Sequence, residues 1–116
     1  MSATFEEFQA MLQTDPAAIV VANINVDRDL ISKARAAGLY VFIGKSSKWG
    51  NPYQVAWDGS QAEIIGKYRQ WLQGQPKLLA ELPALRGKVL GCYCKPRACH
   101  GDILAELAAG RGERAQ

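Results

Sequence analysis

The sequence predicts an α/β fold, in which helices flank a small, single-layer, mostly parallel sheet of three or four strands. Three short, mainly apolar segments, at 18–24, 39–43 and 88–94, are typical of buried strands, and the first is rich in β-branched residues. Segments with helical spacing of apolar residues separate them, and strands that alternate with helices form parallel sheets through crossover connections. The 116 residues suit one domain, which we expect to span 1–110, followed by a flexible tail over 111–116.

The first half of the chain is predicted to contain a helix, a strand, a second helix and a second strand. Apolar residues at helical spacing, with two glutamates in the first turn, predict a helix over 4–12. After the first strand, Asp27 is a candidate N-cap for a helix over 28–37. Gly38 suits the left-handed position that ends such a helix, and the second strand follows at once.

The second half begins with a long polar connection and is then mainly helical. Ser60, with Glu63 three residues later, matches a capping box, so we expect a helix that continues to about Leu72. Pro76 suits the first turn of a further short helix. The third strand, a tight loop and a final helix over 100–109 complete the fold.

Composition narrows the expected compartment and partners. No apolar run approaches the ~20 residues of a membrane-spanning helix, and the N-terminus lacks the signal-peptide pattern, so we expect a cytoplasmic protein without a membrane partner. Three cysteines within eight residues do not suit a disulfide framework. Segment 45–100 has nine basic and three acidic residues, and hence a net charge of +6. This charge favours an anionic small molecule, a nucleotide or a nucleic acid, and an ordinary solvated surface is the alternative.

Two polar loops follow the second and third strands and predict one shared site. The carboxyl ends of parallel strands lie at the same edge of a sheet, and ligands bind there. The predicted ligand-binding residues are Lys45, Ser46, Ser47, Lys48, Trp49, Gly50, Asn51, Cys94, Lys95, Arg97 and Gly101. The predicted catalytic residues are Cys99, His100 and Asp102.

The motifs in these loops resemble those of a known family. The stretches YVFIGKSSKWGNPYQV and ELPALRGKVLGCYCKPRACHGDILAELA are similar to the family catalogued as domain of unknown function 4326. Its members are small bacterial, archaeal and phage proteins with an IGR-S-KWGNP-like and a GCWC-P-CHGD-like segment. The resemblance covers roughly Tyr40 to Leu107, and Lys45 and Tyr93 stand where many members have Arg and Trp. It implies that both loops are important, and it implies no particular activity.

Cys99 and His100 are expected where the final helix begins. The positive end of a helix dipole lowers a thiol pKa from about 8.5, which makes Cys99 a candidate nucleophile. His100 is the only histidine and therefore the candidate acid or base. Asp102 would orient His100 or interact with the dipole, and Gly101 would let a ligand approach closely. The alternative is structural: Cys99 packs against the sheet and His100 caps the helix.

The first loop suits an anion. Serine hydroxyls, backbone amides and lysines bind phosphate, and Trp49 could stack on a base or sugar. Alternatively, the loop is a rigid turn in which Trp49 folds back onto the core. Zinc takes four ligands, and the spacing C-x-C-x4-C-H offers Cys92, Cys94, Cys99 and His100. Because this spacing is unlike that of usual zinc sites, we predict no cofactor and keep zinc as an alternative.

These patterns favour a protein that binds a phosphorylated or nucleotide-like small molecule. The leading hypothesis is an enzyme, such as a cysteine-dependent transferase or hydrolase with a nucleotide-like substrate. The alternatives are a non-catalytic module that binds nucleic acid or assists DNA modification, and a zinc-stabilised interaction domain. No particular oligomeric state is indicated.

Overall fold

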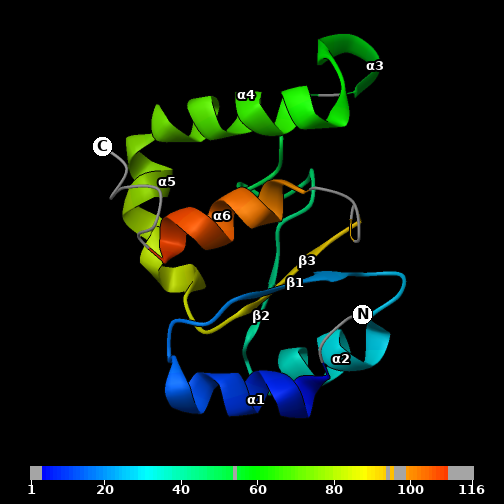
Figure 1. Cartoon of the computed structure of the whole chain (residues 1–116), viewed down its shortest axis with the longest axis vertical. Helices are drawn as coiled ribbons and strands as arrows, with labels where there is room; N and C mark the ends of the chain where they lie inside the picture. Colours follow the sequence, from blue (N-terminus) through cyan, green and yellow to red (C-terminus); the bar gives the residue numbers. More distant parts are fainter. Residues whose placement is uncertain (1–3, 54, 94, 96–98, 110–116) are drawn as a thin grey trace.

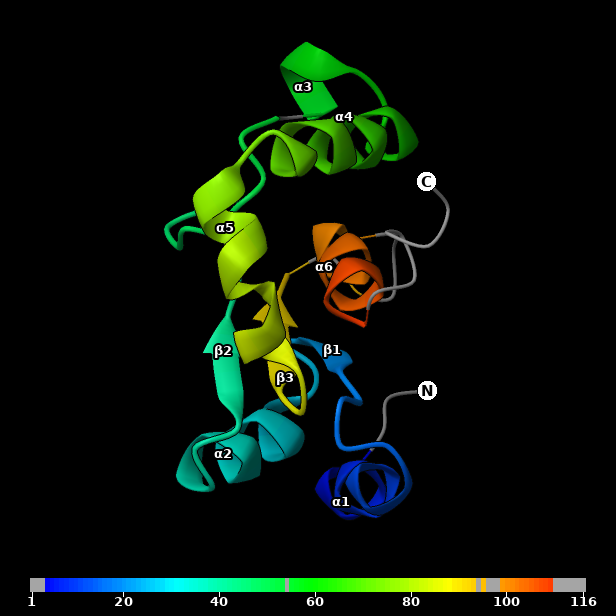
Figure 2. The same cartoon turned by 90° about the vertical axis from the view of Figure 1, so that its left-hand side faces the viewer.

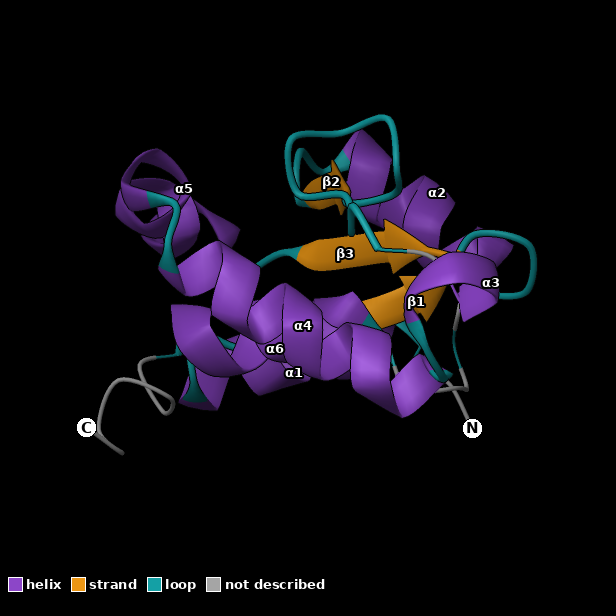
Figure 3. Ribbon diagram, turned by 90° about the horizontal axis from the view of Figure 1, so that it is seen from above, coloured by secondary structure: helices purple, strands orange, loops and turns teal. Residues whose placement is uncertain are grey.

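A three-stranded parallel sheet with helices on both faces forms the framework of the computed structural model (Figure 1), which confirms the predicted α/β class. The structure describes residues 4–53, 55–93, 95 and 99–109, so the predicted tail over 111–116 lies outside the described residues. The strands are β1 (Val20–Asn23), β2 (Tyr40–Phe42) and β3 (Val89–Cys92), and their order in the sheet is β1-β3-β2. Figure 3 shows β1 and β3 running in the same direction.

The helices follow the predicted order, with two short additions, α3 (Val55–Asp58) and the 3-10 helix η1 (Leu82–Leu85). The others are α1 (Phe5–Thr14), α2 (Arg28–Ala36), α4 (Gln61–Gln73), α5 (Pro76–Glu81) and α6 (His100–Ala108). α3 lies within the stretch that we expected to be a polar connection, where its single turn gives no helical period. Among the described residues, no helix combines the length and apolar character needed to cross a membrane.

The strands are shorter than the apolar segments that predicted them. β3 ends at Cys92, whereas the sequence predicted a strand to residue 94. Its neighbours explain the difference, because Asn23 is the last residue of β1 and pairs with Cys92, and Phe42 is the last residue of β2 and pairs with Gly91. Beyond these pairs β3 has no strand partner on either side, so the ladder stops there.

Two layers of helix cover the sheet (Figure 2). α1 and α2 lie on one face, where Phe8 and Leu30 pack with Val89 of the central strand. α6 lies on the other face with α4 packed against it, and Leu90 and Leu104 belong to this second cluster. Successive residues of β3 therefore face opposite layers, as the alternation of side chains along a strand requires.

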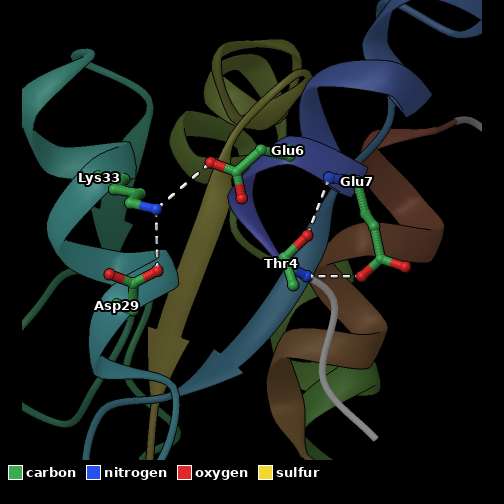
Figure 4. Close-up of polar contacts among 5 residues, drawn as sticks. All are labelled: Thr4, Glu6, Glu7, Asp29 and Lys33. Atoms are coloured by element: carbon green, nitrogen blue, oxygen red, sulfur yellow. Dashed lines mark hydrogen bonds and ion pairs between the residues drawn. The ribbon is translucent and has the colours of Figure 1, made fainter.

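The layer formed by α1 and α2 has its own polar contacts (Figure 4). The Thr4 side chain accepts a hydrogen bond from the Glu7 backbone amide at 3.1 Å, and the Glu7 carboxylate accepts one from the Thr4 amide at 2.8 Å. This capping box satisfies two amide donors at the start of α1. The Lys33 amine on α2 lies 3.1 Å from Asp29 and 3.3 Å from Glu6, so one cation links α2 to α1.

Three predicted cap positions have different outcomes. The capping box of Ser60 and Glu63 at the start of α4 is confirmed, and Gly38 has the predicted left-handed φ of 74°. Asp27 occupies the N-cap position of α2, but its side chain makes no cap hydrogen bond to that helix. Its carboxylate instead accepts from the backbone amide of Asn23 at 2.8 Å, which fixes the turn after β1.

Candidate functional site

A cavity of about 190 Å³ lies at the carboxyl edge of the sheet, beside the N-terminal half of α4. The loop after β2, the first helical turns of α4 and the segment around the end of β3 all line it. The lining residues are Gly44, Lys45, Asn51, Tyr53, Gln61, Ile64, Ile65, Cys92, Tyr93 and His100. The two motif segments, 40–55 and 81–108, thus both contribute to one cavity. They meet there because the strands are parallel and the carboxyl ends of the strands lie at the same edge.

His100, the first residue of α6, is held between the two motif segments. Its side chain is 6% exposed, and its Nε2 lies 2.6 Å from the backbone oxygen of Ile43. A carbonyl oxygen can only accept a hydrogen bond, so Nε2 carries the hydrogen and Nδ1 is the acceptor nitrogen of the neutral ring. Burial lowers the pKa of His100 below its ordinary value, which favours this neutral form. Tyr68 of α4 makes an edge contact with the ring.

The Cys99 sulfur lies inside the protein, which agrees with the structural alternative that Cys99 packs against the sheet. Cys99 is the N-cap of α6 and is 0% exposed. Its Sγ accepts a hydrogen bond from the Gly101 amide at 3.3 Å and lies 3.8 Å from Nδ1 of His100. It also lies 3.0 Å from Sγ of Cys92, the residue that lines the cavity. Of the two cysteines that the structure describes, Cys92 is therefore the one that lines the cavity, and it is itself buried in the strand.

Gly101 and Asp102 hold the first turn of α6 in place. A Cβ atom on Gly101 would lie 2.8 Å from both Ile43 Cδ1 and Val21 Cγ1, so glycine lets the helix approach the sheet. Side chains of the sheet fill the space where a ligand was expected to approach Gly101. The Asp102 carboxylate accepts from the Cys99 amide at 3.1 Å and lies 2.6 Å from the Lys95 amine. It therefore caps the start of the helix. We had expected that Asp102 would either orient His100 or interact with the helix dipole, and the observed position matches the second role.

The Trp49 ring folds back onto the core, as the rigid-turn alternative predicted, and is not exposed for stacking on a base or sugar. Trp49 is 3% exposed and packs in the core cluster on the α6 side of the sheet, which also contains Leu90 and Leu104. Its carbonyl oxygen accepts a 2.6 Å hydrogen bond from the buried Tyr68 hydroxyl. The Ser47 hydroxyl donates to the Gly44 carbonyl at 2.7 Å and accepts from the Trp49 amide at 3.3 Å, so it serves the turn itself.

The other predicted residues of this loop separate into two groups. Lys45 lines the cavity, whereas Lys48 forms an ion pair with Glu81 and its amine lies 5.8 Å from the Trp49 ring centroid. Ser46 is exposed and is not among the lining residues. A Cβ atom on Gly50 would lie 2.7 Å from the Lys45 carbonyl oxygen, so the tight backbone path requires glycine there.

A second hollow of about 740 Å³ runs along β1 between α1 and α6. Two ion pairs border it, Arg69 with Glu106 and Lys95 with Asp102. Two residues of the predicted site therefore line a different depression. We place the candidate site in the smaller cavity, because that one collects side chains from both motif segments.

The remaining predictions concern the residues around the tight loop. Cys94 and Arg97 lie outside the described residues. Within the part of the chain that the structure describes, no three His, Cys, Asp or Glu side chains form a group that could hold a metal ion. The predicted zinc set also included Cys94, so its full geometry lies outside the described residues.

Asn23 is a site residue that sequence reasoning missed. It ends β1, is buried, and donates from Nδ2 to the carbonyl oxygens of Tyr93 at 3.3 Å and Lys95 at 2.5 Å. It thereby holds the backbone at Tyr93 and Lys95, just after β3. An asparagine at the carboxyl end of an apolar strand is the signal that pointed to it, because a buried amide must find hydrogen-bond partners.

Tyr53, Gln61, Ile64 and Ile65 were also missed as lining residues. Gln61, Ile64 and Ile65 reach the cavity because α4 lies over the edge of the sheet, whereas Tyr53 comes from the loop after β2. Nothing local in the sequence indicates that placement, since Ile64 and Ile65 belong to an ordinary apolar helix stripe.

Two viral proteins resemble this chain. An uncharacterized 12.4 kDa protein in the nrdA-td intergenic region of Enterobacteria phage T4 is 61% identical over 71 residues, which cover 58% of this chain and 65% of that protein. Uncharacterized protein R718 of Acanthamoeba polyphaga mimivirus is 30% identical over 69 residues, which cover 53% of this chain and 52% of that protein. The chain thus spans less than two thirds of the length of either relative. No solved structure matches it. Residues 13–110 match the family Domain of unknown function (DUF4326), and the chain belongs to that family.

Proposed function

We propose that the protein binds a small nucleotide-like ligand, with a phosphate or similar anionic group, in the cavity at the carboxyl edge of the sheet. The observation that carries the proposal is the composition of the lining. Lys45 contributes a cation, and no carboxylate occurs among the described residues that line the cavity. His100 is neutral there, so the charge of the lining is positive and favours an anion.

The rest of the lining suits a small planar ring. Ile64 and Ile65 supply an apolar wall, and Tyr53 and Tyr93 supply aromatic faces or edges. The Tyr93 ring is 56% exposed and makes an edge contact with Phe42, which leaves part of the ring open to a ligand. A volume of about 190 Å³ is below the range of about 300 Å³ and more that is common for larger ligands, so we expect one base or sugar to enter.

Asn51 supports the geometry of the loop and of the ligand site. Its Oδ1 accepts a hydrogen bond from the Tyr53 amide at 2.9 Å, which fixes the side chain in an Asx turn. With the oxygen engaged in this way, the amide hydrogens of Asn51 are the groups that can donate to a polar ligand atom.

The same geometry argues for binding more strongly than for cysteine-dependent transfer or hydrolysis. Nε2 of His100 is engaged with Ile43, and Nδ1 is directed toward the Cys99 sulfur. Cys99 itself is fully buried. A nucleophile needs access to the substrate, and this sulfur is shielded behind Cys92 in the wall of the cavity.

Binding can be tested by calorimetric titration with nucleoside 5′-monophosphates, the parent nucleosides and inorganic phosphate. We expect at least one monophosphate to bind, and Lys45→Ala to weaken it about tenfold, which corresponds to about 1.4 kcal/mol. Lys48→Ala is the matched control, because Lys48 belongs to the same loop but pairs with Glu81. Absence of binding by every monophosphate, or equal losses in both variants, would contradict the proposal.

A second candidate function is binding of single-stranded nucleic acid. Trp57 is 82% exposed and Tyr93 is 56% exposed, and exposed aromatic rings can stack on unpaired bases. A salt series with a short DNA strand distinguishes the candidates, because contacts to several phosphates make affinity fall steeply with salt. We expect Trp57→Ala to weaken that binding while leaving monophosphate binding unchanged, since Trp57 does not line the cavity.

A further inference from the structure

We propose that Cys92 and Cys99 form a peroxide-sensitive dithiol pair in the wall of the cavity, which hydroperoxides oxidise to an intramolecular disulfide. The inference does not rest on the proposed ligand, since it concerns the chemistry of the wall itself. It assigns the pair of sulfurs a role that binding of a nucleotide-like molecule does not require.

The distance between the two sulfurs is the first support. Sγ of Cys92 and Sγ of Cys99 lie 3.0 Å apart, and a disulfide bond is about 2.05 Å long. A shift of about 1 Å would therefore bring the two sulfurs to bonding distance. Cys92 ends the central strand and Cys99 caps α6, so two regular elements present the sulfurs to each other.

The surroundings of Cys99 favour its thiolate. Its sulfur accepts a hydrogen bond from the Gly101 amide at the N-terminus of α6, where the helix dipole stabilises negative charge. Nδ1 of His100 lies 3.8 Å from the same sulfur. Because Nε2 donates to the Ile43 carbonyl, Nδ1 has its lone pair available for the thiol proton.

Access separates the roles of the two cysteines. Cys92 lines the cavity although it is only 1% exposed, and Cys99 does not line it. We therefore assign the first contact with a small hydroperoxide to Cys92. The Cys92 thiolate attacks one peroxide oxygen, the O–O bond breaks, and a sulfenic acid forms on Cys92. Water or an alcohol leaves with the thiol proton.

The Cys99 thiolate then completes the reaction. It attacks the sulfur of the Cys92 sulfenic acid, the S–O bond breaks, and the S–S bond forms. His100 receives the proton of Cys99 and passes it to the leaving hydroxide, which departs as water. In total, the two thiols lose two electrons and two protons, and the hydroperoxide is reduced to water and an alcohol, or to two waters.

The disulfide can be mapped by mass spectrometry without any ligand. Trypsin cleaves after Arg97 and not at the Lys95-Pro96 bond, so Cys92 and Cys99 fall in separate peptides, 89–97 and 98–111. The full chain is reduced, treated with a chelator, and exposed to one equivalent of hydrogen peroxide at pH 7. Cys94→Ser is the background of choice, because Cys94 shares the first peptide with Cys92. We expect a loss of 2 Da, from two hydrogens, and one linked peptide pair.

Single variants test the order of events. Cys99→Ser in the same background should accumulate a sulfenic acid on Cys92 that dimedone traps. His100→Gln keeps an amide donor for the Ile43 carbonyl and removes Nδ1, and we expect it to slow disulfide formation about tenfold and to flatten its pH profile. A structural role alone would not change that profile.

Three results would overturn the inference. The first is oxidation of Cys92 no faster than that of free cysteine. The second is a wild-type disulfide that joins Cys94 to either partner while Cys92 and Cys99 are left unlinked to each other. The third is one zinc per purified chain that protects both thiols from peroxide, which would identify the alternative metal-stabilised site. Each leaves nucleotide binding to stand or fall on its own titration.

Discussion

Replacement of Gly101 by alanine tests whether close packing of α6 on the sheet positions His100. The added Cβ would lie 2.8 Å from Ile43 Cδ1 and 2.8 Å from Val21 Cγ1. Val21 is β-branched and stiff, and Ile43 is fully buried, so neither side chain can easily move aside. We therefore expect the first turn of α6 to be pushed from the sheet, which stretches the hydrogen bond from His100 to the Ile43 carbonyl.

The expected free-energy change follows from two opposing effects. Overpacking of a close-packed core costs about 1 to 3 kcal/mol. Replacing glycine by alanine inside a helix stabilises it by up to about 1 kcal/mol, and Gly101 is only the second residue of α6, where this gain is small. We expect Gly101→Ala to be less stable by about 1 to 2 kcal/mol, and its melting temperature to fall by about 4 to 8 °C.

Gly66→Ala is the matched control. Gly66 lies within α4, is exposed, and a Cβ atom there meets no atom within 4 Å. The same chemical change should therefore stabilise the protein by about 0.5 to 1 kcal/mol. Urea unfolding followed by circular dichroism measures both variants. If Gly101→Ala were stabilised as much as Gly66→Ala, the first turn of α6 would not be held as tightly as the structure indicates, and the positioning argument for His100 would fail.

Three further predictions test other parts of the fold. Burial lowers the pKa of His100 from its ordinary value of 6.5. At a pH below 6.5 the unfolded chain therefore binds more protons than the folded chain, which lowers stability. Urea midpoints should fall as the pH drops from 7.5 to 5, and they should fall less in His100→Gln. Tyr68→Phe removes the buried hydrogen bond to the Trp49 carbonyl, and should lower the free energy of unfolding by about 1 to 2 kcal/mol without changing secondary structure. Ser60→Ala removes the cap of α4 and should cost about 1 kcal/mol in urea unfolding, whereas exposed Ser46 replaced by alanine should change nothing measurable.

Local patterns predicted the framework because they depend on neighbouring residues. The Ser60 capping box and the left-handed Gly38 were found from spacing alone, and the alternation of strands and helices gave the parallel sheet. The meeting of the two motif segments followed from that topology. What sequence could not give was α3, since four residues form a single turn without a detectable period.

The orientation of side chains within the site could not be predicted from local sequence patterns. Trp49 lies in a polar, turn-like stretch and therefore resembles an exposed residue, yet its ring packs in the core. The position of Cys99 at a helix N-terminus was predicted correctly, but the burial of its sulfur depends on Gly101, which lets α6 approach the sheet. Asp102 faces Lys95 because helix rotation points it toward the second hollow, and only the packed structure reveals that rotation.

Buried contacts connect the two motif segments to each other. Tyr68 contributes to both connections, since its hydroxyl holds the Trp49 carbonyl of the first segment and its ring contacts His100 of the second. His100 in turn donates to Ile43, where the first segment begins. Buried motif residues such as Trp49 and Cys99 therefore support the cavity from behind, while others, among them Lys45 and Tyr93, line it. A ligand that bound there would meet a preformed pocket, because the buried bonds behind the wall fix its shape before binding.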